Sequence, residues 1–144
     1  MKRILALAIA LVSACCGSHS PVPERTAPSF DRDIAPVLAE RCAMAHGCHG
    51  ADPTPAVDLD LRPAAAYRDL VGVPAESGAI PILRVAPGDP DRSLLLLKLT
   101  GALGPGQGRR MPIDPRTREP ADIMSDHWVG AVLVRWIEAG APRD

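Results

Sequence analysis

Proline and glycine set the main constraint on how this chain can fold. The 144 residues include 16 prolines and 12 glycines, which interrupt helices and strands and favour short elements joined by long ordered loops. Aromatic residues are scarce, with one Phe, one Tyr and two Trp. Because aromatic side chains usually supply much of a small core's buried area, such a domain needs another filler or a covalent staple. A core of Leu, Val and Ile alone is the alternative.

A cluster of sulfur and nitrogen ligands offers such a filler or staple. Two of the four cysteines and two of the four histidines lie in residues 42–50, which read Cys-Ala-Met-Ala-His-Gly-Cys-His-Gly. His49 directly follows Cys48, and five residues separate Cys48 from Cys42. The pattern resembles the attachment site of a c-type haem, in which two thiols form thioethers with the vinyl groups and the adjacent imidazole binds the iron. A haem would also fill the core as a large, flat, apolar group.

The first residues have the pattern of an export signal. Residues 1–14 begin with Lys2 and Arg3 and continue with the apolar run 4–12, which is too short to span a bilayer as a stable helix. The Val-Ser-Ala-Cys sequence that ends at Cys15 resembles a bacterial lipobox, so we expect an acylated Cys15 that anchors the protein to a membrane. An ordinary secretory signal cut nearby is the alternative. Both place the protein in the periplasm or at the cell surface, where free thiols seldom persist.

The remaining chain divides into a tether and one domain. Residues 15–28 have little to bury and are predicted to form a flexible tether, and residues 29–144 are predicted to form one small domain. Removal of Lys2 and Arg3 lowers the 16 basic residues to 14, against 17 acidic ones, a net charge of −3. This charge is too small to indicate nucleic acid or another strongly charged partner.

The domain is predicted to be all-α, because apolar residues recur at helical spacing and no convincing sheet pattern is present. Phe30, Ile34 and Leu38 share one face, and Trp128, Val132 and Trp136 begin a broad apolar stripe near the end of the chain. The run 94–97 is apolar nearly all round and is expected to be well buried. The predicted helices span 29–42, 64–71, 89–101 and 125–139, with a short extended piece at 57–61 and a long loop at 101–120.

Several short motifs follow one another through the domain. They are Phe30 with Asp33-Ile34-Ala35-Pro36, Cys48-His49-Gly50, Leu59-Asp60-Leu61, Val85 to Leu94, Arg110-Met111-Pro112, and Trp136 to Ala141. In this order they resemble a cytochrome c domain, of the variety common in large periplasmic proteins and lipoproteins of planctomycetes and myxobacteria. The resemblance implies short helices and long loops packed around a covalent haem c, with the first and last helices crossing. It implies thioethers at Cys42 and Cys48, His49 as the proximal iron ligand and Met111 as the distal one.

The five-residue spacer leaves other arrangements open. Cys42 and Cys48 could form a disulfide in a haem-free domain of the same fold, or Cys48 could carry a single thioether. A zinc or copper site formed by Cys42, His46, Cys48 and His49 is a further alternative, disfavoured because adjacent Cys and His side chains splay apart.

Residues outside the attachment segment have weaker assignments. Met124 and His127 are the fallback distal ligands. Arg84, Arg109 and Arg110 are expected to be solvated charges, with haem propionates as the alternative partners.

The function expected from these features is one-electron transfer by an exported, membrane-anchored c-type cytochrome, with a redox partner that the sequence does not identify. The chain has no nucleophile elbow, paired carboxylates or phosphate loop, so we do not expect an enzyme. The alternatives are a haem-free interaction domain stapled by a Cys42–Cys48 disulfide and an electron-transferring subunit of an oxidoreductase.

Overall fold

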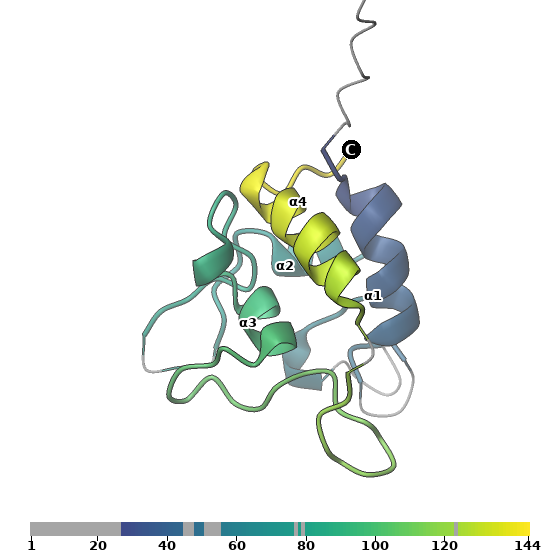
Figure 1. The fold of residues 1–144 in the computed structure, drawn as a ribbon, viewed down its shortest axis with the longest axis vertical. Helices are drawn as coiled ribbons and strands as arrows, with labels where there is room; N and C mark the ends of the chain where they lie inside the picture. The colour runs from purple at the N-terminus through teal and green to yellow at the C-terminus, as the bar shows by residue number, and fades with distance from the viewer. Residues whose placement is uncertain (1–26, 45–47, 51–55, 77, 79, 123) are drawn as a thin grey trace, which may run out of the picture.

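Helices and loops form the domain in the computed structural model, which describes residues 27–44, 48–50, 56–76, 78, 80–122 and 124–144 (Figure 1). The β-pairing within these ranges consists of isolated bridges, so the predicted all-α class is confirmed. The predicted signal, Cys15 and His46 lie outside the described residues. The elements are η1 (Phe30–Ile34), α1 (Ala35–Arg41), η2 (Ala56–Asp58), α2 (Ala66–Leu70), η3 (Pro90–Arg92), α3 (Leu94–Thr100), η4 (Trp128–Val134) and α4 (Arg135–Glu138).

The first predicted helix is present, as the π-helical η1 followed directly by α1. Phe30, Ile34 and Leu38 are fully buried on one face, as the spacing predicts. The widened turn has a clear cause at Pro36, which lacks an N–H and whose ring would press on the carbonyl four residues earlier. The Ala35 N–H accordingly bonds to the Phe30 carbonyl, five residues back.

The last predicted helix comprises η4 and α4, and its start and stop signals were predicted correctly. The Ser125 hydroxyl accepts a hydrogen bond from the Trp128 N–H at 3.2 Å, and Gly140 ends the helix with a φ of 89°. Leu133, Trp136 and Ile137 are fully buried along its inner face.

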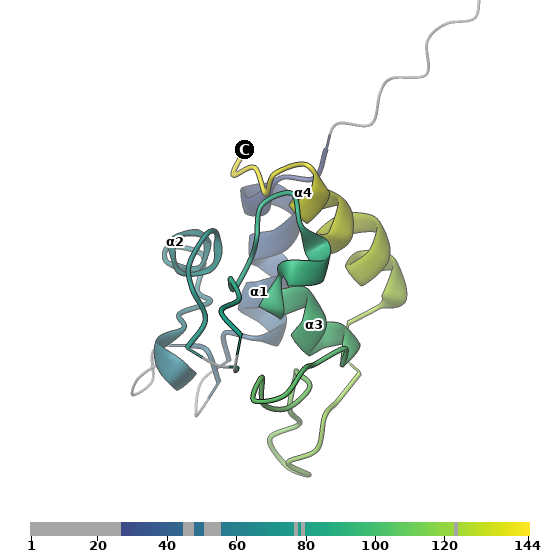
Figure 2. The same ribbon diagram turned by 90° about the vertical axis from the view of Figure 1, so that its left-hand side faces the viewer.

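The first and last helices pack side by side, and the aromatic residues join them (Figures 1 and 2). The Phe30 ring lies 5.7 Å from that of Trp136 and 5.1 Å from that of Tyr67. The Trp128 indole N–H donates to the Asp33 carbonyl at 3.2 Å, and the Tyr67 hydroxyl donates to the Ala141 carbonyl at 3.0 Å. All four aromatic residues of the chain therefore hold the terminal segments together.

The third predicted helix is divided by a buried serine. Asp89 caps η3 by accepting from the Arg92 N–H, but the helix breaks at Ser93 before α3 begins. The Ser93 hydroxyl accepts from the Ala86 N–H at 2.9 Å and donates to the Asp89 carbonyl at 2.8 Å, so it replaces helical bonds with bonds to the preceding loop. The expectation that the whole 94–97 run is well buried is wrong in part, because Leu95 and Leu97 are only half-buried.

Residues 57–61 are not the single extended piece that alternation predicts. Residues 56–58 form the turn η2, in which Val57 and Asp58 have φ values of 51° and 50°. The chain turns because both of its ends are tied to the same dipeptide. The Ala56 N–H bonds to the Cys48 carbonyl at 3.1 Å, and the Leu61 N–H bonds to the His49 carbonyl at 2.8 Å.

Candidate functional site

The predicted haem-attachment residues and the predicted distal loop lie at one end of the domain. In Figures 1 and 2 the end of α1, η2 and the loop after α3 all lie away from the C-terminus and from the start of the first helix. Neither residues 42–61 nor residues 101–122 contain an aromatic residue. The aromatic cluster therefore supports the opposite end, and this end depends on smaller side chains.

A backbone hydrogen bond joins the two ends of the predicted attachment segment, Cys42 and His49, in spite of its long spacer. The His49 N–H bonds to the Cys42 carbonyl at 3.0 Å, and the Cys42 N–H continues the first helix by bonding to the Leu38 carbonyl at 2.8 Å. In a Cys-x2-Cys-His motif on a helical turn, the His amide reaches the first Cys carbonyl four residues earlier. Here the same two backbone groups are joined across seven positions. The extra residues are thus accommodated without separating Cys42 from His49.

Gly50 allows this closure. A Cβ atom at this position would lie 2.6 Å from the Ala43 carbonyl oxygen and 3.0 Å from that of Met44. Both obstructing atoms belong to the backbone and cannot rotate away. The glycine after His49 is therefore required for close approach of two chain segments rather than for an unusual φ.

His49 is held in one orientation by a backbone carbonyl. Its Nδ1 lies 3.2 Å from the Leu59 carbonyl oxygen, and because a carbonyl only accepts, Nδ1 carries the hydrogen. Burial lowers the pKa of His49, the Leu59 and Ala56 carbonyls oppose this, and the Lys98 and Arg84 charges lower it further. The imidazole is thus neutral at pH 7, with the lone pair on Nε2 available to a metal.

Cys42 and Cys48 are both free thiols and both half-buried. Burial raises the pKa of the Cys42 thiol to about 11, and the proximity of Cys48 acts in the same direction. The Cys42 thiol is therefore protonated at neutral pH. Reduced thiols are the form that can add to haem vinyl groups.

Met111 is half-buried in the loop after α3, and its N–H donates to the Lys98 carbonyl at 2.9 Å. The positive charge of Lys98 also contributes to the lowered pKa of His49. Among the residues described, no hydrogen bond joins Met111 to His49.

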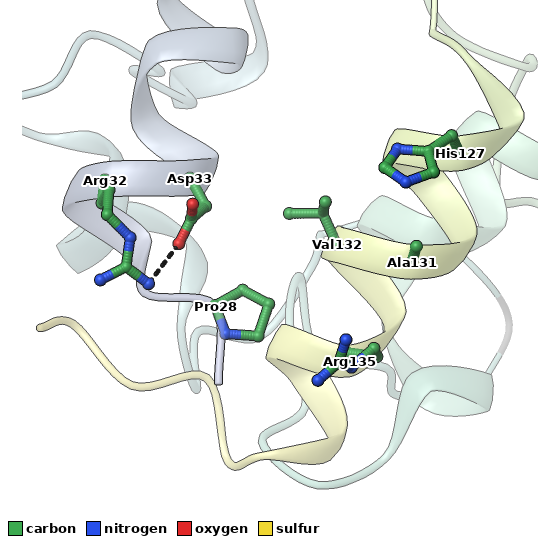
Figure 3. Close-up of a pocket in the computed structure, with 7 residues that line it drawn as sticks. All are labelled: Pro28, Arg32, Asp33, His127, Ala131, Val132 and Arg135. Carbon is green, nitrogen blue, oxygen red and sulfur yellow. Dashed lines mark ion pairs between the residues drawn. The ribbon is translucent and has the colours of Figure 1, made fainter. Parts of the chain in front are cut away.

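The two fallback ligands have other environments. Met124 is only 7% exposed and packs in the hydrophobic core, so its sulfur is occupied by packing. His127 lines a cleft of about 370 Å³ between η1 and η4, and Asp33 and Arg135 are among the other residues that line this cleft (Figure 3). Cys42, Cys48, His49 and Met111 do not line this cleft.

The three arginines considered for haem propionates already have protein partners. Arg84 donates to the Asp69 carbonyl, and Arg109 donates to the Arg118 carbonyl and pairs with Glu119 at 3.2 Å. Arg110 donates to the Leu99 carbonyl at 3.1 Å. Their partners hold loops together, which is a structural role.

Among the described residues, no group of three or more His, Cys, Asp or Glu side chains could hold a metal ion. The four-ligand zinc or copper alternative includes His46, which lies outside those residues. A haem requires less of the protein, since its ring supplies four nitrogen ligands and a single imidazole completes the proximal side. The residues present fit a haem by their chemistry: two reduced thiols, one neutral imidazole with a fixed tautomer and one methionine.

The comparisons with known proteins add no relative. No protein-family model matches the chain, and no curated protein or solved structure is significantly similar to it. Within the described part of the chain, none of the helices is long and apolar enough to cross a membrane.

Sequence reasoning missed three residues that shape the site: the Leu59 carbonyl, Gly50 as a close-approach residue, and Lys98. The signal for Lys98 was present, because it is the only lysine after Lys2. The role of Leu59 had no signal, since any residue has a carbonyl.

Proposed function

We propose that this chain is an exported c-type cytochrome lipoprotein that transfers one electron at a time. Cys42 and Cys48 form the thioethers of a covalent haem, His49 is the proximal iron ligand and Met111 the distal one. The all-α domain is a cytochrome c-like fold in this proposal, and acylated Cys15 anchors it to a membrane through the tether.

The observation that carries the proposal is the hydrogen bond from His49 Nδ1 to the Leu59 carbonyl. Metal-bound histidines almost always donate their second ring N–H to a carboxylate, a carbonyl or water, which fixes the tautomer and orients the ring. His49 has this arrangement directly beside Cys48. The 3.0 Å bond from its amide to Cys42 supports the same reading, because both cysteines and the imidazole belong to one closed turn.

The distribution of apolar residues gives independent support. The four aromatic residues lie outside the segments that form the site end, which has Leu59 and Ala43 as half-buried residues packed against the core. A flat apolar group at this end supplies the contact area that aromatic side chains usually provide.

A c-type haem supplies a one-electron Fe(III)/Fe(II) couple when bound. His49 binds the iron through Nε2, and Leu59 keeps that nitrogen unprotonated. Met111 supplies a thioether sulfur, and methionine in place of a second histidine raises the reduction potential. With His49 and Met111 both holding the iron, a bound haem would favour electron transfer over oxygen chemistry, so we assign a carrier rather than an enzyme.

The experiment is expression in a bacterium that contains c-type maturation machinery, followed by haem staining of a denaturing gel and a pyridine haemochrome spectrum. Wild-type protein should carry covalent haem, and His49→Ala should lose the low-spin spectrum. His127→Ala is the matched control, because it removes a histidine from the exposed cleft, and it should match the wild type. Colourless wild-type protein would refute the proposal.

The haem-free interaction domain is the second candidate, and it is favoured by the hydrogen bond that ties the residue after Cys48 to the Cys42 carbonyl. Oxidation of that pair would form a disulfide that closes a short loop and stabilises the domain by about 2 kcal/mol. Cys48→Ala separates the candidates. It should lower haem attachment if the proposal is right, and it should change only stability if the cysteines form a staple.

A further inference from the structure

Lys98 occupies an unusual position among the basic residues of the chain. It is the only lysine after Lys2, and it lies half-buried near the end of α3. Its side-chain ammonium donates to the Arg109 carbonyl at 3.1 Å, and its own carbonyl accepts the Met111 N–H at 2.9 Å. One residue therefore contacts both ends of the tripeptide that ends in Met111.

The end of α3 explains why this loop binds there. The last carbonyls of a helix have no partner within the helix and must find one elsewhere. The Lys98 carbonyl accepts from Met111, and the Leu99 carbonyl accepts from the Arg110 guanidinium at 3.1 Å. The loop therefore satisfies two helix-end carbonyls while the Lys98 side chain holds its Arg109 carbonyl.

Gly108 forms the other wall of the site that the ammonium occupies. It has a φ of 78°, and a Cβ atom there would lie 2.9 Å from the Lys98 nitrogen. A side chain at Gly108 would displace the ammonium from the Arg109 carbonyl. The space between Gly108 and the Arg109 carbonyl suits a compact ammonium better than a planar guanidinium. This explains why position 98 is a lysine, although the other basic residues of the domain are arginines.

We infer that Lys98 is a positioning residue that holds the Met111 segment (residues 108–111) against the end of α3 and so fixes the distal iron ligand. The inference rests on the proposed function, since it gives Met111 a place beside a haem. Lys98 does not bind the iron. Lys98 limits how far the sulfur of Met111 can move away from the iron.

The test compares haem-loaded wild-type protein with the Lys98→Ala and Gly108→Ala variants. Cyanide must displace Met111 to bind ferric iron, so a less restrained segment should bind it more tightly. Loss of one hydrogen bond should raise the cyanide affinity by about tenfold. The charge-transfer band of methionine-ligated ferric haem should weaken in parallel. Arg135→Ala is the control, since it removes an exposed positive charge from α4 and should leave both readouts unchanged.

A second measurement does not depend on haem. In haem-free protein, Lys98→Ala should accelerate hydrogen exchange of the Met111 amide by about tenfold, because the segment loses the hydrogen bond from the Lys98 side chain. The backbone carbonyl of residue 98, which accepts from the Met111 amide, is still present in this variant. Thermal unfolding of each variant shows whether it is folded before the other readouts are interpreted.

The outcomes distinguish this inference from the proposed function. Wild-type protein with the methionine band, together with variants of unchanged cyanide affinity and exchange, would overturn the role of Lys98 and leave the cytochrome proposal intact. Wild-type protein without covalent haem would overturn both. Covalent haem without the methionine band would overturn Met111 as ligand, and Lys98 as its positioning residue with it.

Discussion

Replacement of Gly50 by alanine tests the closed attachment turn. The new methyl carbon would lie 2.6 Å from the Ala43 carbonyl oxygen, well inside ordinary contact distance. The backbone of Gly50 is not in the left-handed region, so alanine can adopt its φ and the penalty is steric. Overpacking of this kind costs about 1–3 kcal/mol, and loss of the bond between the His49 amide and Cys42 adds about 0.5–1.5 kcal/mol. We therefore expect Gly50→Ala to lower the free energy of unfolding by about 2–4 kcal/mol.

Gly130→Ala is the matched control. Gly130 is exposed in η4, also lacks a positive φ, and no described atom lies within 4 Å of its added Cβ. Alanine there should stabilise the helix by about 0.5–1 kcal/mol. The assay is urea unfolding followed by circular dichroism, together with the yield of covalent haem. Equal stability and equal haem yield for Gly50→Ala and the wild type would refute the closed turn.

Two further substitutions test other parts of the account. Met124→Ala should lower the free energy of unfolding by about 2–5 kcal/mol, because the side chain is 7% exposed in the core, yet leave the methionine charge-transfer band intact. Loss of that band would show that Met124, not Met111, is the distal ligand. The Arg62 guanidinium holds the pKa of Asp60 below its ordinary value near 3.8. The stability from this pair is therefore complete above about pH 5 and is lost as pH falls through the lowered folded-state pKa. Urea unfolding between pH 2 and 7 should show that the free energy of unfolding depends less on pH in Asp60→Asn than in the wild type. Identical pH profiles for the two proteins would contradict the role of this ion pair.

The helices could be predicted from sequence because their determinants are local. Phe30, Ile34 and Leu38 repeat at helical spacing, Ser125 caps the last helix and Gly140 ends it, and each of these signals acts within a few residues. The π-helical form of η1 follows from Pro36. The sequence indicates that this proline distorts the helix, but it does not indicate which kind of helical turn results.

The features that sequence reasoning missed depend on contacts between distant segments. Val57 has a positive φ because Cys48 and His49 hold both ends of its turn, and this overrides the strand preference of alternating residues. Ser93 breaks the third helix because the Ala86 amide needs an acceptor. Such constraints appear only when the chain is folded.

The candidate site was predicted in part. The sequence identified Cys42, Cys48 and His49 as one cluster, and in the structure the His49 amide bonds to the Cys42 carbonyl and the Leu59 carbonyl fixes the His49 ring. It could not predict that the Leu59 carbonyl orients that ring, since backbone groups have no sequence signature. The role of Met111 stays a prediction.

Peptide mass spectrometry of the mature protein, purified from a maturation-competent host, tests the covalent haem most directly. We predict that the peptide containing Cys42 and Cys48 carries one haem bound through both sulfurs. A colourless protein whose corresponding peptide shows only a Cys42–Cys48 disulfide would contradict the assignment.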